Sequence, residues 1–196
     1  MTIALTSRAA ETSAPILPAL AERWSPRSFV TSDTIDETAL TAALEAARWA
    51  PSANNSQPAH FIVARRGSAA FEAVRGALLG FNQAWAGNAA ALVVGVAEMA
   101  DAEGNARRFA EYDLGQALAL FTVQAHHDGL HVHQMGGVNG AAIAEAFDLP
   151  ERFVPLTVAA VGTLDSADAL PDEALRSRET APRTRRPLAE SLLINE

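Results

Sequence analysis

The sequence contains no cysteine, and this absence excludes several kinds of chemistry. Without thiols the chain can form no disulfide, cannot use a thiolate nucleophile and cannot build a cysteine-ligated zinc or iron–sulfur site. A cysteine-free composition suits a reducing compartment, and we expect the protein to be cytoplasmic.

Lysine is absent as well, because all 15 basic side chains are arginines. The chain therefore has no lysine for Schiff-base chemistry or for a phosphate-binding P-loop. Every cationic contact must come from a planar guanidinium, which suits two-bond recognition of phosphate.

Long apolar runs and an excess of positive charge are also missing. The chain has no apolar run of about 18 residues, the length at which a membrane span is considered. Its formal net charge of −8 argues against non-specific binding of nucleic acid, which requires a basic surface. We therefore expect neither a membrane nor a nucleic acid as partner.

The length of 196 residues and the hydrophobic content of 49% indicate one domain with a substantial core. Residues 1–14 are expected to form a flexible lead-in, because Glu11 interrupts them and no apolar segment is long enough for a signal peptide. The domain would span residues 15–196, with a C-terminal extension from about residue 171 that holds five arginines.

Helices are indicated by apolar periodicity in five segments, namely residues 15–23, 34–50, 67–79, 105–128 and 139–147. In the second segment, Thr34 and Glu37 have the spacing of a capping box, and Pro51 requires the helix to stop at Ala50. The longest helix is apolar on more than one face, so it should be central or lie at a subunit interface.

Strands are expected in four short segments, namely residues 60–65, 90–97, 130–134 and 155–162. The second and fourth segments are continuously apolar, which is typical of strands that are buried on both faces with helices above and below. The pattern predicts an α+β layer fold.

Familiar catalytic motifs are missing: there is no G-x-S-x-G, no H-E-x-x-H and no G-x-G-x-x-G after a strand. A nicotinamide coenzyme held by a Rossmann motif is therefore not expected. His131 and His133 share one face of a predicted strand, but a third metal ligand is not evident. We interpret these histidines as structural and predict no metal site.

Two short segments at opposite ends of the chain alternate arginine with a hydroxyl residue. The first is the arginine turn, residues 23–27 (Arg-Trp-Ser-Pro-Arg), and the second is residues 183–185 (Arg-Thr-Arg). Side chains at i and i+2 of an extended segment point to the same side, so both guanidiniums can reach one anion. Together the segments would suit a phosphomonoester dianion, whereas either alone could be a solvated surface turn.

Five fragments in order resemble the flavin-dependent nitroreductase family: RWSPRSF, ARWAPSANNSQPAHFIV, GFNQAW, GLHVHQMGGVN and PRTRRPLAE. The resemblance runs from about residue 16 to residue 190, and A-P-S-x-x-N-x-Q-P is its most specific part. It implies a three-layer α+β fold with a central, mainly antiparallel sheet flanked by helices. It also implies a homodimer that binds one FMN at each subunit interface.

By position, the resemblance assigns contacts with the flavin to thirteen residues. The arginine turn and the C-terminal arginines would bind the phosphate and pyrimidine, a loop of the partner subunit would lie against the ring, and glycines would let a backbone amide approach flavin N5. The expected cofactor-binding residues are Arg23, Trp24, Ser25, Arg27, Pro51, Ser52, Ala53, Asn55, Asn82, Gly136, Gly137, Arg183 and Arg185. For Pro51 and Ala53 plain loop rigidity is the alternative interpretation, and Trp24 would use only its backbone.

One position departs from the family pattern. Trp85 stands where many members carry a lysine, three residues after the asparagine of the pyrimidine contact. This aromatic residue, like Phe81 and Phe109, could line a substrate pocket, although core packing is the usual role of such side chains.

The resemblance implies an oxidoreductase that uses FMN to pass a hydride from NAD(P)H, through flavin N5, to an electron-poor acceptor such as a nitroaromatic or a quinone, in a ping-pong sequence. No side chain would be a catalytic acid or base, because the flavin carries the chemistry. The alternatives are a related flavin enzyme, such as an enoate reductase or a dehalogenase, and a non-catalytic protein that binds or stores FMN.

Overall fold

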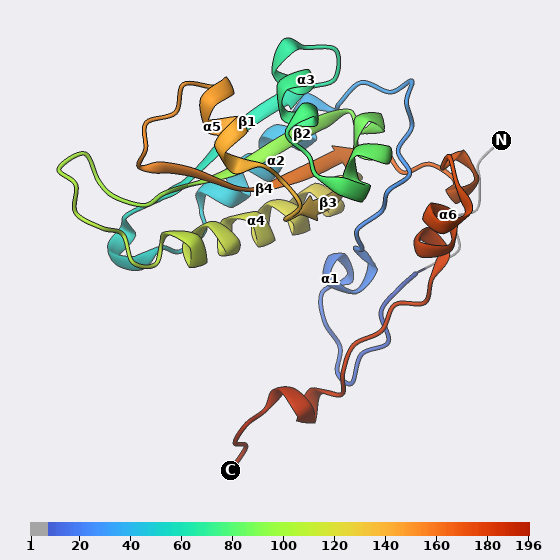
Figure 1. Cartoon of the computed structure of the whole chain (residues 1–196). Helices are drawn as coiled ribbons and strands as arrows, with labels where there is room; N and C mark the ends of the chain where they lie inside the picture. The colour runs from blue at the N-terminus through green and yellow to red at the C-terminus, as the bar shows by residue number, and fades with distance from the viewer. Residues whose placement is uncertain (1–7) are drawn as a thin grey trace.

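A four-stranded antiparallel sheet forms the centre of the computed structural model, which describes residues 8–196 (Figure 1). Residues 1–7 of the predicted lead-in lie outside the described part. The strands lie in the order β1, β2, β4 and β3, and they comprise Ala59–Arg65, Ala91–Glu98, Phe153–Gly162 and His131–Met135. All four strands overlap the segments that the sequence predicts.

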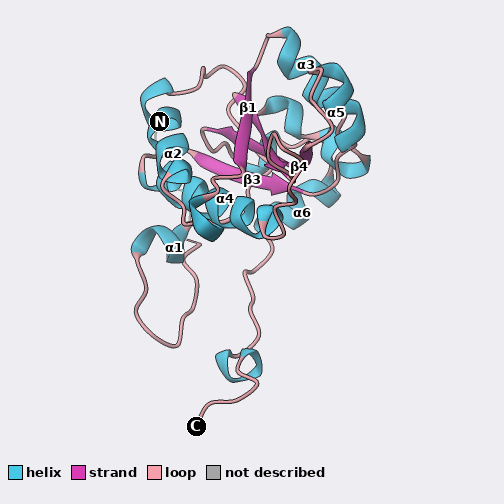
Figure 2. Cartoon of the chain, turned by 90° about the vertical axis from the view of Figure 1, so that its left-hand side faces the viewer, coloured by secondary structure: helices cyan, strands magenta, loops and turns pink. Residues whose placement is uncertain are grey.

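Helices cover both faces of the sheet, as Figure 2 shows. On one side lie α2 (Glu37–Arg48) and α4 (Ala110–His127), and on the other lie α3 (Ala69–Gly76) and α5 (Gly140–Ala146). Each side encloses its own hydrophobic cluster. Residues 91–97 of β2 are all buried, which explains the continuous apolar run. The predicted three-layer α+β fold is confirmed.

The start of α2 corrects the predicted capping box. Asp36, not Thr34, caps the helix, because its carboxylate accepts hydrogen bonds from the Thr38 and Ala39 backbone N–H groups at 2.9 and 3.0 Å. A carboxylate at this position also interacts favourably with the helix dipole. The partner of Glu37 is Arg65 of β1 and not the cap. The helix ends at Arg48, two residues before the predicted end.

Two short helices lie near the ends of the chain. The first, α1 (Pro18–Glu22), is shorter than its predicted range, and the second, α6 (Glu173–Thr180), is not predicted by the sequence. The α6 segment has no apolar stripe and buries only Leu175 and Glu179, one turn apart. Beyond α6 the C-terminal extension projects away from the sheet (Figures 1 and 2).

The described helices include none with the length and apolar composition needed to cross a membrane.

Candidate functional site

The two arginine-rich segments surround one cavity of about 310 Å³, here called the arginine pocket. Its walls come from residues 8–27 at one end of the chain and residues 178–185 at the other. Six guanidiniums line it, and they belong to Arg8, Arg23, Arg27, Arg178, Arg183 and Arg185. Trp24 and Ser25, both predicted site residues, line the same cavity.

The backbone of the arginine turn is held by groups distant in sequence. Arg23 is the C-terminal cap of α1, and its extended conformation (φ −62°, ψ 141°) ends that helix and begins the turn. From the C-terminal side, Glu179 of α6 accepts hydrogen bonds from the Arg27 and Ser28 backbone N–H groups. Arg183 donates to the carbonyl oxygen of Ala21 at 2.7 Å, which joins the extension to α1.

The arginine pocket carries more positive charge than the protein itself neutralises. Of its six guanidiniums, only that of Arg27 forms an ion pair within residues 8–196, with Glu179 at 3.8 Å. Burial lowers the pKa of Arg23 and of Arg183, and neighbouring arginines lower both further. Arginine does not lose its proton in proteins, so a bound anion would relieve this repulsion.

An orphaned donor points to the same conclusion. The Nε atom of Arg23 is buried and has no hydrogen-bond partner among the described residues. An unpaired buried donor is costly, and a charge-assisted bond to a phosphate oxygen would satisfy it. The pocket therefore fits a phosphate group.

The predicted contacts with the flavin pyrimidine and N5 lie beside this pocket. Asn82 donates its side-chain N–H to the carbonyl oxygen of Gly137 at 3.4 Å. A Cβ at position 137 would lie only 2.9 Å from the side-chain amide nitrogen of Asn82, so a larger residue would require this amide to shift. Gly136 precedes it at the end of β3. The guanidinium of Arg178 lies 4.5 Å from the Phe81 ring centroid, which connects this pair to the arginine pocket.

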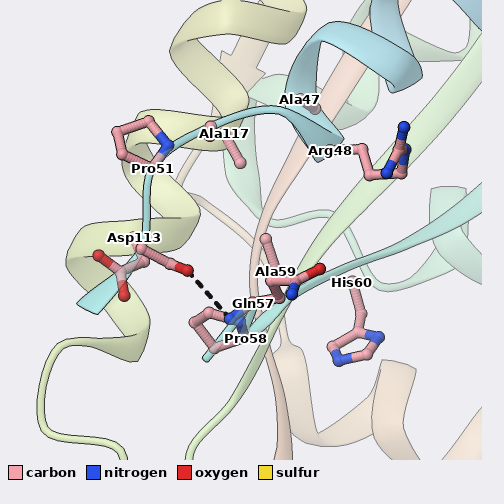
Figure 3. A pocket seen from close by; sticks show the side chains of 11 residues that line it. Ala47, Arg48, Pro51, Gln57, Pro58, Ala59, His60, Asp113 and Ala117 are labelled. Carbon is pink, nitrogen blue, oxygen red and sulfur yellow. Dashed lines mark hydrogen bonds between the residues drawn. The ribbon is translucent and has the colours of Figure 1, made fainter. Parts of the chain in front are cut away.

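The 51–59 loop, which carries the other predicted contacts, lines a second cavity of about 210 Å³ (Figure 3). Pro51 and Ser52 face it, and the Ser52 hydroxyl accepts a hydrogen bond from the Gln57 N–H at 3.0 Å. Asn55 adopts a left-handed conformation (φ 55°), which keeps the loop compact. The Ala53 N–H donates to Asp113 of α4 at 3.0 Å.

Within one chain, the 51–59 loop and the arginine pocket lie at opposite ends of α4. The loop is bonded to Asp113 near the start of this helix, whereas His126, in its last turn, is close enough to Arg23 for their charges to interact. His126 is thirteen positions after Asp113, which corresponds to about 20 Å along the helix. The structure thus brings the arginine, asparagine and glycine residues together but leaves the predicted loop apart from them.

His133 connects the core to the arginine turn. Its Nδ1 lies 2.9 Å from the carbonyl oxygen of Pro26, and its ring centroid lies 4.5 Å from that of Trp85. Trp85 is 1% exposed and also stacks on Phe29, so it belongs to the core and does not form a pocket wall. Among residues 8–196 no group of three or more potential metal ligands is found.

Sequence reasoning missed Arg8 and Arg178, which line the arginine pocket, and Glu179, which lies behind its wall. Arg8 lies in a lead-in without secondary structure, and its guanidinium stacks 4.0 Å from the Trp24 ring centroid. Arg178 and Glu179 lie on the unpredicted α6. No local motif marks these residues, because their partners lie 16 to 175 positions away in the chain and are brought close only by folding.

Replacing Arg23 or Arg185 with alanine is predicted to weaken binding of FMN, the phosphomonoester that the family resemblance implies. Each charge-assisted contact is worth about 1.5–3 kcal/mol, so the dissociation constant should rise roughly 10- to 100-fold. Fluorescence titration measures this. The matched control is Arg186→Ala, because this neighbouring arginine does not line the pocket. Unchanged affinity in both variants would exclude the phosphate site.

Two half-buried histidines, His131 and His133, predict a loss of stability in acid. Burial lowers the pKa of His133 to about 4, whereas histidine in an unfolded chain titrates near 6.5. As the pH falls from about 6.5 towards 4, His133 takes up a proton in the unfolded chain but stays neutral in the folded chain. The free energy of unfolding therefore decreases. His131 behaves in the same way, with a pKa of about 4.

The variant His133→Gln should therefore lose about 2 kcal/mol less unfolding free energy than the wild type between pH 7 and pH 5. Urea denaturation at both pH values measures the difference. His127→Gln, at an exposed position, should lose as much as the wild type. Identical losses in wild type and His133→Gln would contradict the prediction.

Comparison with known proteins supports the predicted resemblance. The model of the nitroreductase family matches residues 20–81 and 68–163. A solved structure described as an oxidoreductase containing FMN is 33% identical and covers 98% of each chain, with a TM-score of 0.88. A relative from Mycolicibacterium smegmatis, an uncharacterised 15.4 kDa protein, is 37% identical over 134 residues, which are 64% of this chain and 88% of that protein.

A more distant structure shares the fold. This protein from Desulfovibrio desulfuricans, described as a nitroreductase and solved in complex with FMN, is 24% identical over 94% of this chain and 99% of its own, with a TM-score of 0.74. The match of the family model extends over well more than half of the chain and includes the arginine turn, the sheet and the glycine loop. The chain therefore belongs to the nitroreductase family.

Proposed function

We propose that this protein is an FMN-dependent oxidoreductase that works as a homodimer. The observation that carries the proposal is the arginine pocket, in which both ends of the chain present guanidiniums to one cavity of about 310 Å³. FMN ends in a phosphomonoester, and such a dianion would satisfy the unpaired Nε of Arg23 and reduce the repulsion among the arginines. The 33% identical structure that contains FMN supports this choice of cofactor.

The ring of the cofactor would extend from the pocket towards Asn82 and Gly137. The close contact between these residues leaves backbone at the surface where a flat ring can approach. When bound, FMN would supply hydride transfer, in ping-pong order, from NAD(P)H to an electron-poor acceptor such as a nitroaromatic or a quinone. The protein would bind, orient and electrostatically tune the flavin, and no side chain need act as acid or base.

A second copy of the chain would complete the site. The 51–59 loop lies about 20 Å along α4 from the arginine pocket, so the loop that covers a given flavin would come from the partner subunit. Trp49 and Tyr112 beside this loop are 72% and 67% exposed. Exposed aromatic patches of this kind mark interaction surfaces.

The C-terminal extension supports the same assembly. It projects from the sheet and exposes Leu193 and Ile194 almost fully. We propose that residues 15–196 act as one domain whose extension, from about residue 171, packs on the partner subunit. Cytoplasmic localisation remains a prediction from the cysteine-free composition.

The first experiment is anaerobic mixing of the FMN-loaded protein with NADH or NADPH. An oxidoreductase should lose the visible absorption band of oxidised flavin and regain it when an acceptor is added. A yellow protein that responds to neither nicotinamide would support the FMN-binding or storage alternative. A protein that binds no FMN at all would overturn the proposal. A panel of nitroaromatic, quinone, enoate and halogenated acceptors would separate the related flavin reactions.

Dilution tests the shared site. When the protein is diluted below the dissociation constant of the dimer, the subunits separate. FMN should then leave the protein, because each flavin would lose the partner's loop. Analytical ultracentrifugation at flavin and protein wavelengths follows both species. A monomer that retains stoichiometric FMN would contradict the composite site.

A further inference from the structure

We propose that Glu179 is a positioning residue that assembles the arginine pocket by holding the backbone of the arginine turn. Only the identity of the phosphate ligand rests on the proposed function. Glu179 itself stays behind the pocket wall and is not among the residues that line the cavity.

The contacts of Glu179 are almost entirely with backbone N–H groups. Its two carboxylate oxygens accept from the Arg27 N–H at 3.0 and 2.9 Å, and one of them also accepts from the Ser28 N–H at 3.2 Å. The guanidinium of Arg27 is farther away, at 3.8 Å. The carboxylate is therefore placed to fix the main chain more than to neutralise a side chain.

These bonds lie in the interior and depend on each other. Glu179 is 2% exposed and Ser28 is 1% exposed. Burial raises the pKa of Glu179, and the two N–H groups and the Arg27 charge oppose that rise. Removing the carboxylate would leave both N–H groups without the partner they have in this structure, which is costly for buried donors.

The same bonds align two parts of the pocket that are about 150 positions apart in the chain. Arg178 is the neighbour of Glu179 on α6, and residues 183–185 follow directly after this helix. Fixing Glu179 against the arginine turn therefore sets how the C-terminal guanidiniums face those of Arg23 and Arg27. An error of about 1 Å in such an arrangement is enough to break charge-assisted hydrogen bonds.

The sign of the charge makes a geometric role distinguishable from an electrostatic one. A carboxylate beside an anion site repels the ligand, so electrostatics alone predicts tighter phosphate binding when Glu179 is neutralised. A positioning role predicts the opposite, namely weaker binding. The direction of the change thus separates the two interpretations.

The experiment compares FMN with riboflavin, which has the same ring without the phosphate, in wild type and in Glu179→Gln. Glutamine keeps the size of the side chain but directs an N–H₂ group at a backbone N–H. We expect the FMN dissociation constant to rise at least tenfold, by loss of aligned phosphate contacts, and that of riboflavin to rise by a smaller factor, because riboflavin has no phosphate to lose. The preference for FMN over riboflavin should therefore fall.

Two further variants serve as controls. Glu173→Gln, at an exposed position of α6 where the glutamate pairs with Arg176, should keep the wild-type preference. Glu179→Asp keeps the charge but withdraws the carboxylate by one methylene group. It should also weaken FMN selectively, and it provides a milder variant if Glu179→Gln does not fold, as judged by urea denaturation.

Two outcomes would overturn the inference: FMN affinity that is unchanged or higher in Glu179→Gln, and equal losses for FMN and riboflavin, which would indicate a general loss of structure. Failure of the proposed function would be detected separately, by comparing FMN and riboflavin binding in the wild type. A wild-type protein with no preference for FMN over riboflavin would remove the phosphate site itself.

Discussion

Arginine side chains keep their positive charge in proteins, so the arginines of the pocket repel one another. The rest of the site depends on how this repulsion is balanced. Six guanidiniums surround one cavity, and within residues 8–196 a single carboxylate pairs with one of them. The fold must therefore supply enough energy elsewhere to hold these charges together until an anion binds. That energy comes from the two hydrophobic clusters of the three-layer core, on which both ends of the chain are anchored.

A series of side-chain contacts connects the core to the arginine turn. Phe29, directly after the turn, is 1% exposed and stacks on Trp85, which in turn packs against His133. The His133 ring then contacts the Pro26 carbonyl. Trp85 thus contributes packing to the core, at a position where the resemblance to the family leads us to expect a cation.

The long helix α4 decides how a complete flavin site can be built. It carries Asp113, which holds the 51–59 loop, near one end and His126, beside the arginine pocket, at the other. A rigid element of this length keeps the two halves of the proposed site apart in one chain. The apolar surface that α4 keeps exposed, including Tyr112, is the natural place for a second copy. In the proposed homodimer, α4 would contribute both to assembly and to the separation of the two halves of the site.

The sequence by itself determined the strands, the main helices and the family, because apolar periodicity and ordered motifs are local properties of the chain. It also named Arg23, Arg27, Arg183 and Arg185 as residues suited to one anion. Only the tertiary structure decided that these residues meet, that Arg8 and Arg178 join them, and that Asp36 replaces Thr34 as a helix cap. Helix α6 has a local cap in Asp172, but it has no apolar stripe that would predict it. The role of Glu179 was not predictable either, because its partners lie about 150 positions away in the chain and leave no local pattern.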